Sequence, residues 1–434
     1  MKEKLDLFSV KRDTEIHSKV SFLLEDYYEE ERNLLSEMFE GFVDRDHKVV
    51  NQFQETFHST FWEIYLYSVL KKCNFEIDWS HEHPDFIVTA PNRFYIEAVT
   101  SNKRLNKEHD YRNGMGGAWE ITKGYKDSED YNILMRESIS RNYYKIRDKL
   151  KCYNDKYKKN DWFDESLPYV VALGSYSQEN YGREYIFPLL ALLYGQYYRP
   201  STNGFSEADY VYRLEEDGTD EKEQIPLGIF NSNEYADVSA IIYSSAVSLG
   251  KLSALCSSDK KIVHVWYDGD SEEPFKVTSD IKEKLTDGLF IFHNPFARTP
   301  LPKSVFEYEH ICQFFDDENG TLKSESPHAH LVGRSVVGTK DKYYPENLDK
   351  LHIVNAAELN LVNQLKIEAY KNYNYYNITP EKTMLKKIES KINIRNGEFF
   401  NKTKTKTKTK TKTKTKTKTK KNDMQKKSRR KIDN

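Results

Sequence analysis

The stretch HPDFIVTAPNRFYIEAV, residues 83–99, contains two short apolar runs separated by a turn around Pro91. Apolar runs of this length bounded by turn residues predict the two arms of a β-hairpin. Each arm carries one carboxylate, Asp85 at the start of the first and Glu97 inside the second. Carboxylates are poor strand residues and cost free energy to bury. Their presence on both arms therefore predicts a function for the pair.

The two carboxylates can share one divalent cation if the strand register brings them together. Neighbouring strands lie about 4.8 Å apart, and Glu97 shares one face of its arm with Tyr95 and Val99. Glu63, on the preceding helix, is a third candidate ligand. Carboxylates gathered in an apolar site repel one another unless a cation neutralises them, and oxygen ligands favour Mg²⁺ or Mn²⁺ over zinc. Such a metal would polarise a phosphoryl oxygen and activate a water molecule.

Helix and strand patterns surround the hairpin in a definite order. Apolar residues at helical spacing, from Phe53 to Ile64, predict a buried helix over 49–72, and residues 101–130 are polar and predict a long loop. The full order is helix, strand, strand, strand, helix, strand. The segments expected in this half are helices 14–45, 49–72 and 132–153 and strands 74–78, 85–90, 93–99 and 168–176. Those expected in the second half are strands 237–245, 261–268 and 288–295 and helices 245–255, 356–371 and 380–392.

The pair Pro84-Asp85, followed by Glu97 on the next strand and set in this element order, resembles the PD-(D/E)xK nuclease superfamily. The resemblance covers about residues 50–176. It implies an α/β (α+β) protein with a restriction-endonuclease-like αβββαβ core. It also implies that Asp85 and Glu97 bind the catalytic metal and that Glu63 supports the metal site, as a helical glutamate does in many members.

The sequence departs from the superfamily pattern at one position. The pattern places a lysine two residues after the glutamate, where it orients the attacking water and stabilises charge at the phosphate. This chain has Val99 there, and Val99 can do neither. Lys103, just beyond the strand end, is the candidate replacement and the third predicted catalytic residue beside Asp85 and Glu97. Other side chains that could assist are Lys71, Lys72, Thr100 and Asn102.

A second resemblance covers more of the chain. The segments FWEIYLYSVL, HPDF, IEAVTSN, DVSAIIYSS and HNPFARTPLP are similar to a group of uncharacterised bacterial proteins, over most of 50–310. This similarity implies no particular reaction. The expected organisation is an N-terminal helical segment (1–49), the core (50–195), a second α/β region that extends the sheet or forms its own domain (196–345), a helical region (346–400) and a disordered basic tail (401–434).

The charge of the chain is unevenly distributed. Residues 401–434 carry 14 Lys and 2 Arg against 2 Asp, a net charge of +14, so residues 1–400 carry −16 of the total of −2. Residues 402–419 are nine Lys-Thr dipeptides, which have no apolar face to bury and predict a solvated, extended segment. Repeat expansion without a selected function is the favoured interpretation of this tail. The alternative is a polycation that holds nucleic acid without sequence preference.

Composition indicates a cytoplasmic protein. The start of the chain has no apolar leader, and the longest apolar run, 186–194, is too short to span a bilayer. The four cysteines are widely spaced without a C-x-x-C pair, which argues against a zinc ribbon or a disulfide framework and fits a reducing compartment.

Several weaker motifs have ordinary interpretations. His81-x-His83 and His328-x-His330 have a chelating spacing but no second ligand pair nearby, which favours turn or surface histidines. NGMGG (113–117) lacks the Gly-Lys-Ser/Thr ending of a phosphate loop, and GSYS (174–177) is not a nucleophile elbow. In HNPFARTPLP, the side chains His293, Asn294 and Arg298 could contact substrate, and a proline-rich turn explains them equally well.

The function expected from these patterns is a Mg²⁺-dependent nuclease that hydrolyses phosphodiester bonds in DNA or RNA, in bacterial defence or a mobile element. The alternative is a catalytically inactive member of the fold that binds nucleic acid or a protein partner, which Val99 favours. A third possibility, an interaction protein without nuclease ancestry, predicts that Asp85 and Glu97 lie far apart or on opposite faces. Nucleic acid is the expected partner, a protein partner or homodimer remains open, and no membrane association is expected.

Overall fold

The structure is a computed structural model. It describes residues 5–9, 16–102, 120–121, 128–176, 184–199, 204–214, 220–256, 260–267, 275–278, 281–308, 311–326 and 329–337. The predicted helices 356–371 and 380–392, the Lys-Thr tail, the NGMGG motif and Lys103 lie outside the described residues, as does His328.

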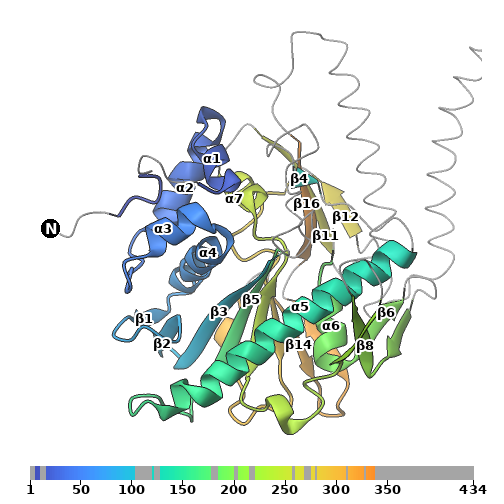
Figure 1. Cartoon of the computed structure of the whole chain (residues 1–434). Coiled ribbons are helices and arrows are strands. Elements are labelled where there is room, and N and C mark those ends of the chain that lie inside the picture. The colour runs from blue at the N-terminus through green and yellow to red at the C-terminus, as the bar shows by residue number, and fades with distance from the viewer. Residues whose placement is uncertain are drawn as a thin grey trace, which may run out of the picture. The chain divides into compact units, whose positions relative to one another are not determined.

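The described part of the chain has the expected α/β architecture, built on an eight-stranded mixed sheet (Figure 1). The strands follow the order β1-β2-β3-β5-β10-β13-β14-β15. Within it β3, β5 and β10 are parallel neighbours, and β1, β2 and β3 form an antiparallel meander. The strands are β1 (Glu76–Asp78), β2 (Phe86–Ala90), β3 (Phe94–Asn102), β5 (Tyr169–Tyr176), β10 (Ala240–Ser244), β13 (Phe290–His293), β14 (Cys312–Asp316) and β15 (Leu322–Glu325).

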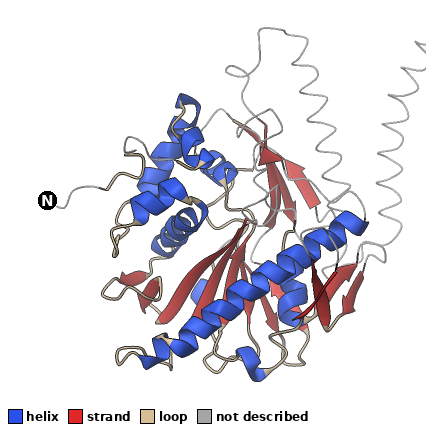
Figure 2. Cartoon of the chain, in the orientation of Figure 1, coloured by secondary structure: helices blue, strands red, loops and turns tan. Residues whose placement is uncertain are grey.

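Two helices cover opposite faces of the first half of this sheet, as Figure 2 shows. On one face α4 (His58–Lys72) packs on Ile96 and Ala172, and the indole nitrogen of Trp62 donates to the Ala172 carbonyl at 3.0 Å. On the other face α5 (Ser128–Asp155) forms the crossover between the parallel strands β3 and β5. A Cβ at Gly174 would lie 2.9 Å from the Trp62 ring, so the close approach of α4 to β5 requires glycine there.

The single helix predicted over 49–72 is two helices, α3 (Val49–Glu55) and α4. Phe57 separates them with a φ of 51°, in the left-handed region that non-glycine residues seldom adopt. Its ring nevertheless stacks on Phe61, with centroids 5.0 Å apart. The helical spacing of apolar residues therefore continues across the break, because the turn leaves both rings in the same hydrophobic core. The helix predicted over 14–45 is likewise divided, into α1 (Ser18–Leu23) and α2 (Glu29–Phe39).

The second half of the chain adds to the sheet and builds smaller ones. β10 and β13 to β15 continue the main sheet, whereas the strand predicted at 261–268 belongs to a separate four-stranded sheet with the order β12-β11-β16-β4. Two hairpins, β6–β7 and β8–β9, follow α6. Their elements are β4 (Glu120–Ile121), α6 (Phe187–Tyr194), β6 (Gln196–Arg199), β7 (Gly204–Glu207), β8 (Tyr210–Leu214), β9 (Asp220–Pro226), α7 (Leu249–Leu255), β11 (Lys261–Tyr267), β12 (Phe275–Thr278) and β16 (His330–Val337).

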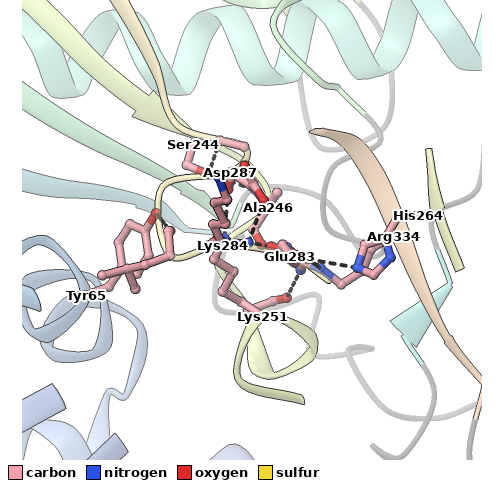
Figure 3. A network of polar contacts seen from close by, with 12 residues as sticks. Tyr65, Ser244, Ala246, Lys251, His264, Glu283, Lys284, Asp287 and Arg334 are labelled. Atoms are coloured by element: carbon pink, nitrogen blue, oxygen red, sulfur yellow. Dashed lines mark hydrogen bonds and ion pairs between the residues drawn. The ribbon is translucent and has the colours of Figure 1, made fainter. Parts of the chain in front are cut away.

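A buried polar network centred on Glu283 joins α7 to the smaller sheet (Figure 3). The Glu283 carboxylate contacts the Lys251 ammonium at 2.6 Å and the Arg334 guanidinium at 2.6 and 2.7 Å. It also lies 3.2 Å from Nε2 of His264. Burial disfavours the charge of Glu283, but Arg334 and Lys251 outweigh it and hold the pKa of Glu283 well below its usual range. The network therefore fixes a charged carboxylate inside the protein.

Among the described residues, no helix is both long and apolar enough to cross a membrane.

Candidate functional site

The register of β2 and β3 brings Asp85 beside Glu97. Phe86 pairs with Ile96, so the next position along places Asp85 opposite Glu97. The regular pairing stops there. Instead, Oδ2 of Asp85 accepts a hydrogen bond from the backbone N–H of Ala98 at 2.7 Å. The two acids are thus adjacent at the point where the strands separate, which is the juxtaposition that a shared carboxylate site requires.

Arg45, from the segment before α3, holds the chain that carries Asp85. Its guanidinium donates to the backbone carbonyls of His81 at 2.5 Å, Pro84 at 3.3 Å and Asp85 at 3.0 Å. These carbonyls point to Arg45, so they are not available to pair with β3. Pro84 also lacks the backbone N–H that such pairing would need. Arg45 therefore positions Asp85, a role that no local sequence pattern indicated.

Lys149 on α5 supplies the positive charge of the site. Its Nζ lies 2.6 Å from Oε1 of Glu97, with the side chains 24% and 3% exposed, respectively. Burial acts to lower the pKa of Lys149, but the neighbouring Glu97 and Asp85 outweigh it and raise the pKa above its usual value. The ammonium is therefore charged at neutral pH.

The lysine at this site was not among the predicted replacements for Val99. Lys103 lies outside the described residues, and the Lys71 ammonium donates to the Glu40 carbonyl at 3.0 Å. Lys149 comes from the crossover helix, 52 positions after Glu97. The only sequence signal was a run of basic residues in 145–159, which holds seven Lys and Arg against two Asp.

Glu63 lies on α4, close enough to Glu97 and Lys149 that their charges affect its pKa. No hydrogen bond of its carboxylate is found among the described residues. Burial raises its pKa to about 7, with Glu97 and Asp46 adding to the rise and Lys149 and Arg45 opposing it. Burial likewise raises the pKa of Asp85, and Glu97 and Glu63 raise it further. Three acids thus share two cations, Lys149 and Arg45, so the site has fewer positive than negative groups.

The fit to a metal ion is partial. Among the residues that the structure describes, no group of three or more His, Cys, Asp or Glu side chains could hold a metal ion. The three-carboxylate set Glu63, Asp85 and Glu97 is therefore not assembled as direct ligands. The pair Asp85 and Glu97 remains, and Oε2 of Glu97 is buried without a hydrogen-bond partner in the part of the chain that the structure describes. Mg²⁺ is commonly held by one or two carboxylates, with waters and substrate phosphates completing its shell.

Aromatic rings border the site. The Tyr157 hydroxyl lies close enough to Glu97 that burial and this carboxylate together raise the pKa of Tyr157. The ring of His83 stacks on Tyr157 with centroids 6.1 Å apart, and His81 stacks on Trp162 at 3.8 Å. The two histidines of the His-x-His pair thus lie against rings at the edge of the site.

The downstream motif HNPFARTPLP has structural contacts. Nε2 of His293 lies 2.8 Å from the Gln313 side-chain oxygen, and the Asn294 amide donates to the carbonyls of Tyr235 and Val238, both at 2.9 Å. Arg298 forms an ion pair with Asp237. These contacts support the interpretation of this motif as a turn.

No protein-family model, no curated protein and no solved structure matches the chain.

Proposed function

We propose that the protein is a metal-dependent phosphodiesterase of the PD-(D/E)xK type that acts on nucleic acid. The observation that carries the proposal is the contact of the Lys149 ammonium with Glu97, beside Asp85, at the point where β2 and β3 separate. Two carboxylates and a lysine are the three groups of the superfamily motif, and their proximity here supports the proposal. The lysine comes from a helix rather than from the position of Val99.

Each residue has a distinct role in this proposal. Asp85 and Glu97 would hold Mg²⁺ or Mn²⁺, which supplies Lewis-acid activation of a phosphoryl oxygen when bound. Lys149 stabilises negative charge at the phosphate and orients the attacking water through its remaining protons. Glu63, with a pKa of about 7, can accept a proton at neutral pH. Arg45 positions Asp85 without touching the substrate.

The electrostatics next to the site favour a polyanionic substrate. Residues 145–159 carry a net charge of +5, whereas residues 1–400 as a whole carry −16. Nucleic-acid affinity depends mainly on cations near the phosphate backbone, so the local charge matters more than the total.

A second candidate is a catalytically inactive member of the fold that binds nucleic acid or a protein. Two observations favour it. Lys149 already neutralises Glu97, and no three-ligand metal group is found among the described residues. In this case the Lys149 ammonium takes the place of the metal ion, and its ion pair with Glu97 only stabilises the fold.

Cleavage assays on the full chain separate the two functions. Wild type, Asp85→Ala, Lys149→Met and Lys151→Met would be incubated with supercoiled plasmid, linear duplex, single-stranded DNA and RNA, each with Mg²⁺, Mn²⁺ or EDTA. Lys151 is an exposed lysine of the same helix and serves as the matched control. We expect metal-dependent cutting that Asp85→Ala and Lys149→Met each reduce at least 100-fold and that Lys151→Met leaves intact. Absence of cutting by folded wild type on every substrate would favour the inactive member.

A further inference from the structure

Two lysine–glutamate ion pairs in this protein have equally short contacts but different surroundings. In one, the Lys149 ammonium lies 2.6 Å from Oε1 of Glu97, and the lysine side chain is 24% exposed. In the other, the Lys251 ammonium lies 2.6 Å from Oε1 of Glu283, and the lysine side chain is 1% exposed. Solvent therefore reaches the lysine of the first pair, whereas the second pair is enclosed.

The two ammonium groups also differ in how many acceptors hold them. Lys251 donates to Glu283 and to two backbone carbonyls at 2.7 and 2.8 Å, so each of its three N–H bonds has an acceptor (Figure 3). Within the described ranges, Glu97 is the only hydrogen-bond acceptor of the Lys149 ammonium. Lys149 can therefore move away after losing one contact, whereas Lys251 would have to lose three.

Lys149 is the outer member of its pair. The Glu97 side chain is 3% exposed, much less than the lysine that contacts it. The second carboxylate oxygen, Oε2, is buried and has no hydrogen-bond partner among the residues described. A cation that arrives from solvent on the side of Lys149 therefore meets the ammonium before it meets the carboxylate.

The Lys149 ammonium and a divalent cation would compete for Glu97. Like charges a few ångströms apart repel each other, so the two are disfavoured together at one carboxylate. Asp85 and Glu63 lie close enough for their charges to act on the same place, and a doubly charged ion gains more from these acids than an ammonium does. The flexible four-carbon stem of lysine lets the ammonium move while α5 stays in place.

We propose that Lys149 occupies the Glu97 carboxylate while no metal is bound, and that a divalent cation at Asp85 and Glu97 releases the ammonium toward the phosphate of a substrate. This inference rests on the proposed function, which it deepens by assigning a regulatory exchange to the same site. Before the metal binds, the ion pair spares Glu97 from burial without a counter-charge. After the exchange, the lysine is free to act on the substrate, so metal binding and the readiness of Lys149 are coupled.

Metal affinity tests the exchange without requiring catalysis. Binding of Mn²⁺ to the full chain would be measured by electron paramagnetic resonance, which detects the free ion. We expect Lys149→Met to bind Mn²⁺ at least about tenfold more tightly than wild type, because its Glu97 has no competing cation. Adding Glu97→Ala to Lys149→Met should abolish this gain. The matched control Lys151→Met, which removes an exposed lysine of the same helix, should bind like wild type.

The chemical reactivity of the lysines reports the movement itself. The full chain would be treated briefly with acetic anhydride, with and without Mn²⁺, and acetylation at each lysine would be measured by mass spectrometry. We expect Mn²⁺ to raise the acetylation of Lys149 several-fold. Lys251, which three acceptors hold, should stay unreactive in both conditions, and the exposed Lys151 should react equally in both.

Either measurement can overturn the inference. Mn²⁺ binding that is unchanged or weaker in Lys149→Met would do so, as would acetylation of Lys149 that does not respond to Mn²⁺. Absence of Mn²⁺ binding by both folded wild type and Lys149→Met would also overturn it.

The results also separate the failure of this exchange from the failure of the proposed function. Tighter Mn²⁺ binding by Lys149→Met, with metal-dependent acetylation but without cleavage by wild type, would support the exchange and count against the nuclease. Metal-dependent cleavage by wild type, with the same Mn²⁺ affinity in Lys149→Met, would support the nuclease and overturn the exchange.

Discussion

Two acidic sites in this protein differ in how their charge is balanced, one around the buried Glu283 and one around the half-buried Glu63 and Asp85. Glu283 is contacted by Lys251, Arg334 and His264, and each of its oxygens has a partner within 3.2 Å. At the candidate site, three acids, Glu63, Asp85 and Glu97, lie near two cations, Lys149 and Arg45. In the first arrangement two cations, Lys251 and Arg334, neutralise the carboxylate. The second is short of positive charge, which is the condition under which a cation or a phosphate-bound metal would bind.

The largest expected effect concerns the balanced group. Glu283→Gln leaves the buried cations Lys251 and Arg334 without their counter-charge, and removing one partner of a buried ion pair typically costs about 3–5 kcal/mol. The free energy of unfolding, measured with urea, should fall by that amount. Glu325→Gln, which breaks the exposed pair with Lys303, is the control and should cost under about 1 kcal/mol. A similar small loss in both variants would mean that the network does not hold α7 to the smaller sheet.

A smaller effect is expected at Lys149. Lys149→Met removes the cation that contacts Glu97, but the lysine is partly exposed, so we expect a loss of about 1–3 kcal/mol in the free energy of unfolding at pH 8. Combining it with Glu97→Gln should recover part of the loss, because the double change removes both charges. Lys151→Met should leave stability unchanged. Additive losses in the double variant would show that the two side chains do not interact.

The smallest effect, on the pH dependence of stability, concerns Glu63. Its pKa rises from 4.5 to about 7 on folding. As the pH rises through this window, the unfolded chain releases the proton first, so wild type loses stability and the loss is complete above pH 7. Glu63→Gln should therefore gain about 1–2 kcal/mol relative to wild type at pH 8 and nothing at pH 4.

Urea unfolding across this pH range measures the difference, with exposed Glu55→Gln as the control. Parallel pH profiles for wild type and Glu63→Gln would contradict an ionisable Glu63 in a site short of positive charge.

Local patterns predicted most of the first half of the fold. The arms expected at 85–90 and 93–99 are β2 and β3, and the segments expected at 132–153 and 168–176 are α5 and β5. These four predictions are confirmed because hydrophobic periodicity and turn residues are local signals, which extend over about ten residues. The break at Phe57 escaped prediction for the same reason, since Phe53, Phe57 and Phe61 keep helical spacing across it.

The sequence by itself determined which residues form the hairpin and that each arm carries a carboxylate, because alternation along a strand is a local property. The tertiary structure alone decided what surrounds those carboxylates. Arg45 reaches Asp85 across 40 positions and Lys149 reaches Glu97 across 52. Such partners depend on where a loop and a crossover helix pack against the sheet, and many charged residues of similar local context compete for the same place. Packing, rather than any sequence motif, therefore decides which basic residues lie beside these carboxylates.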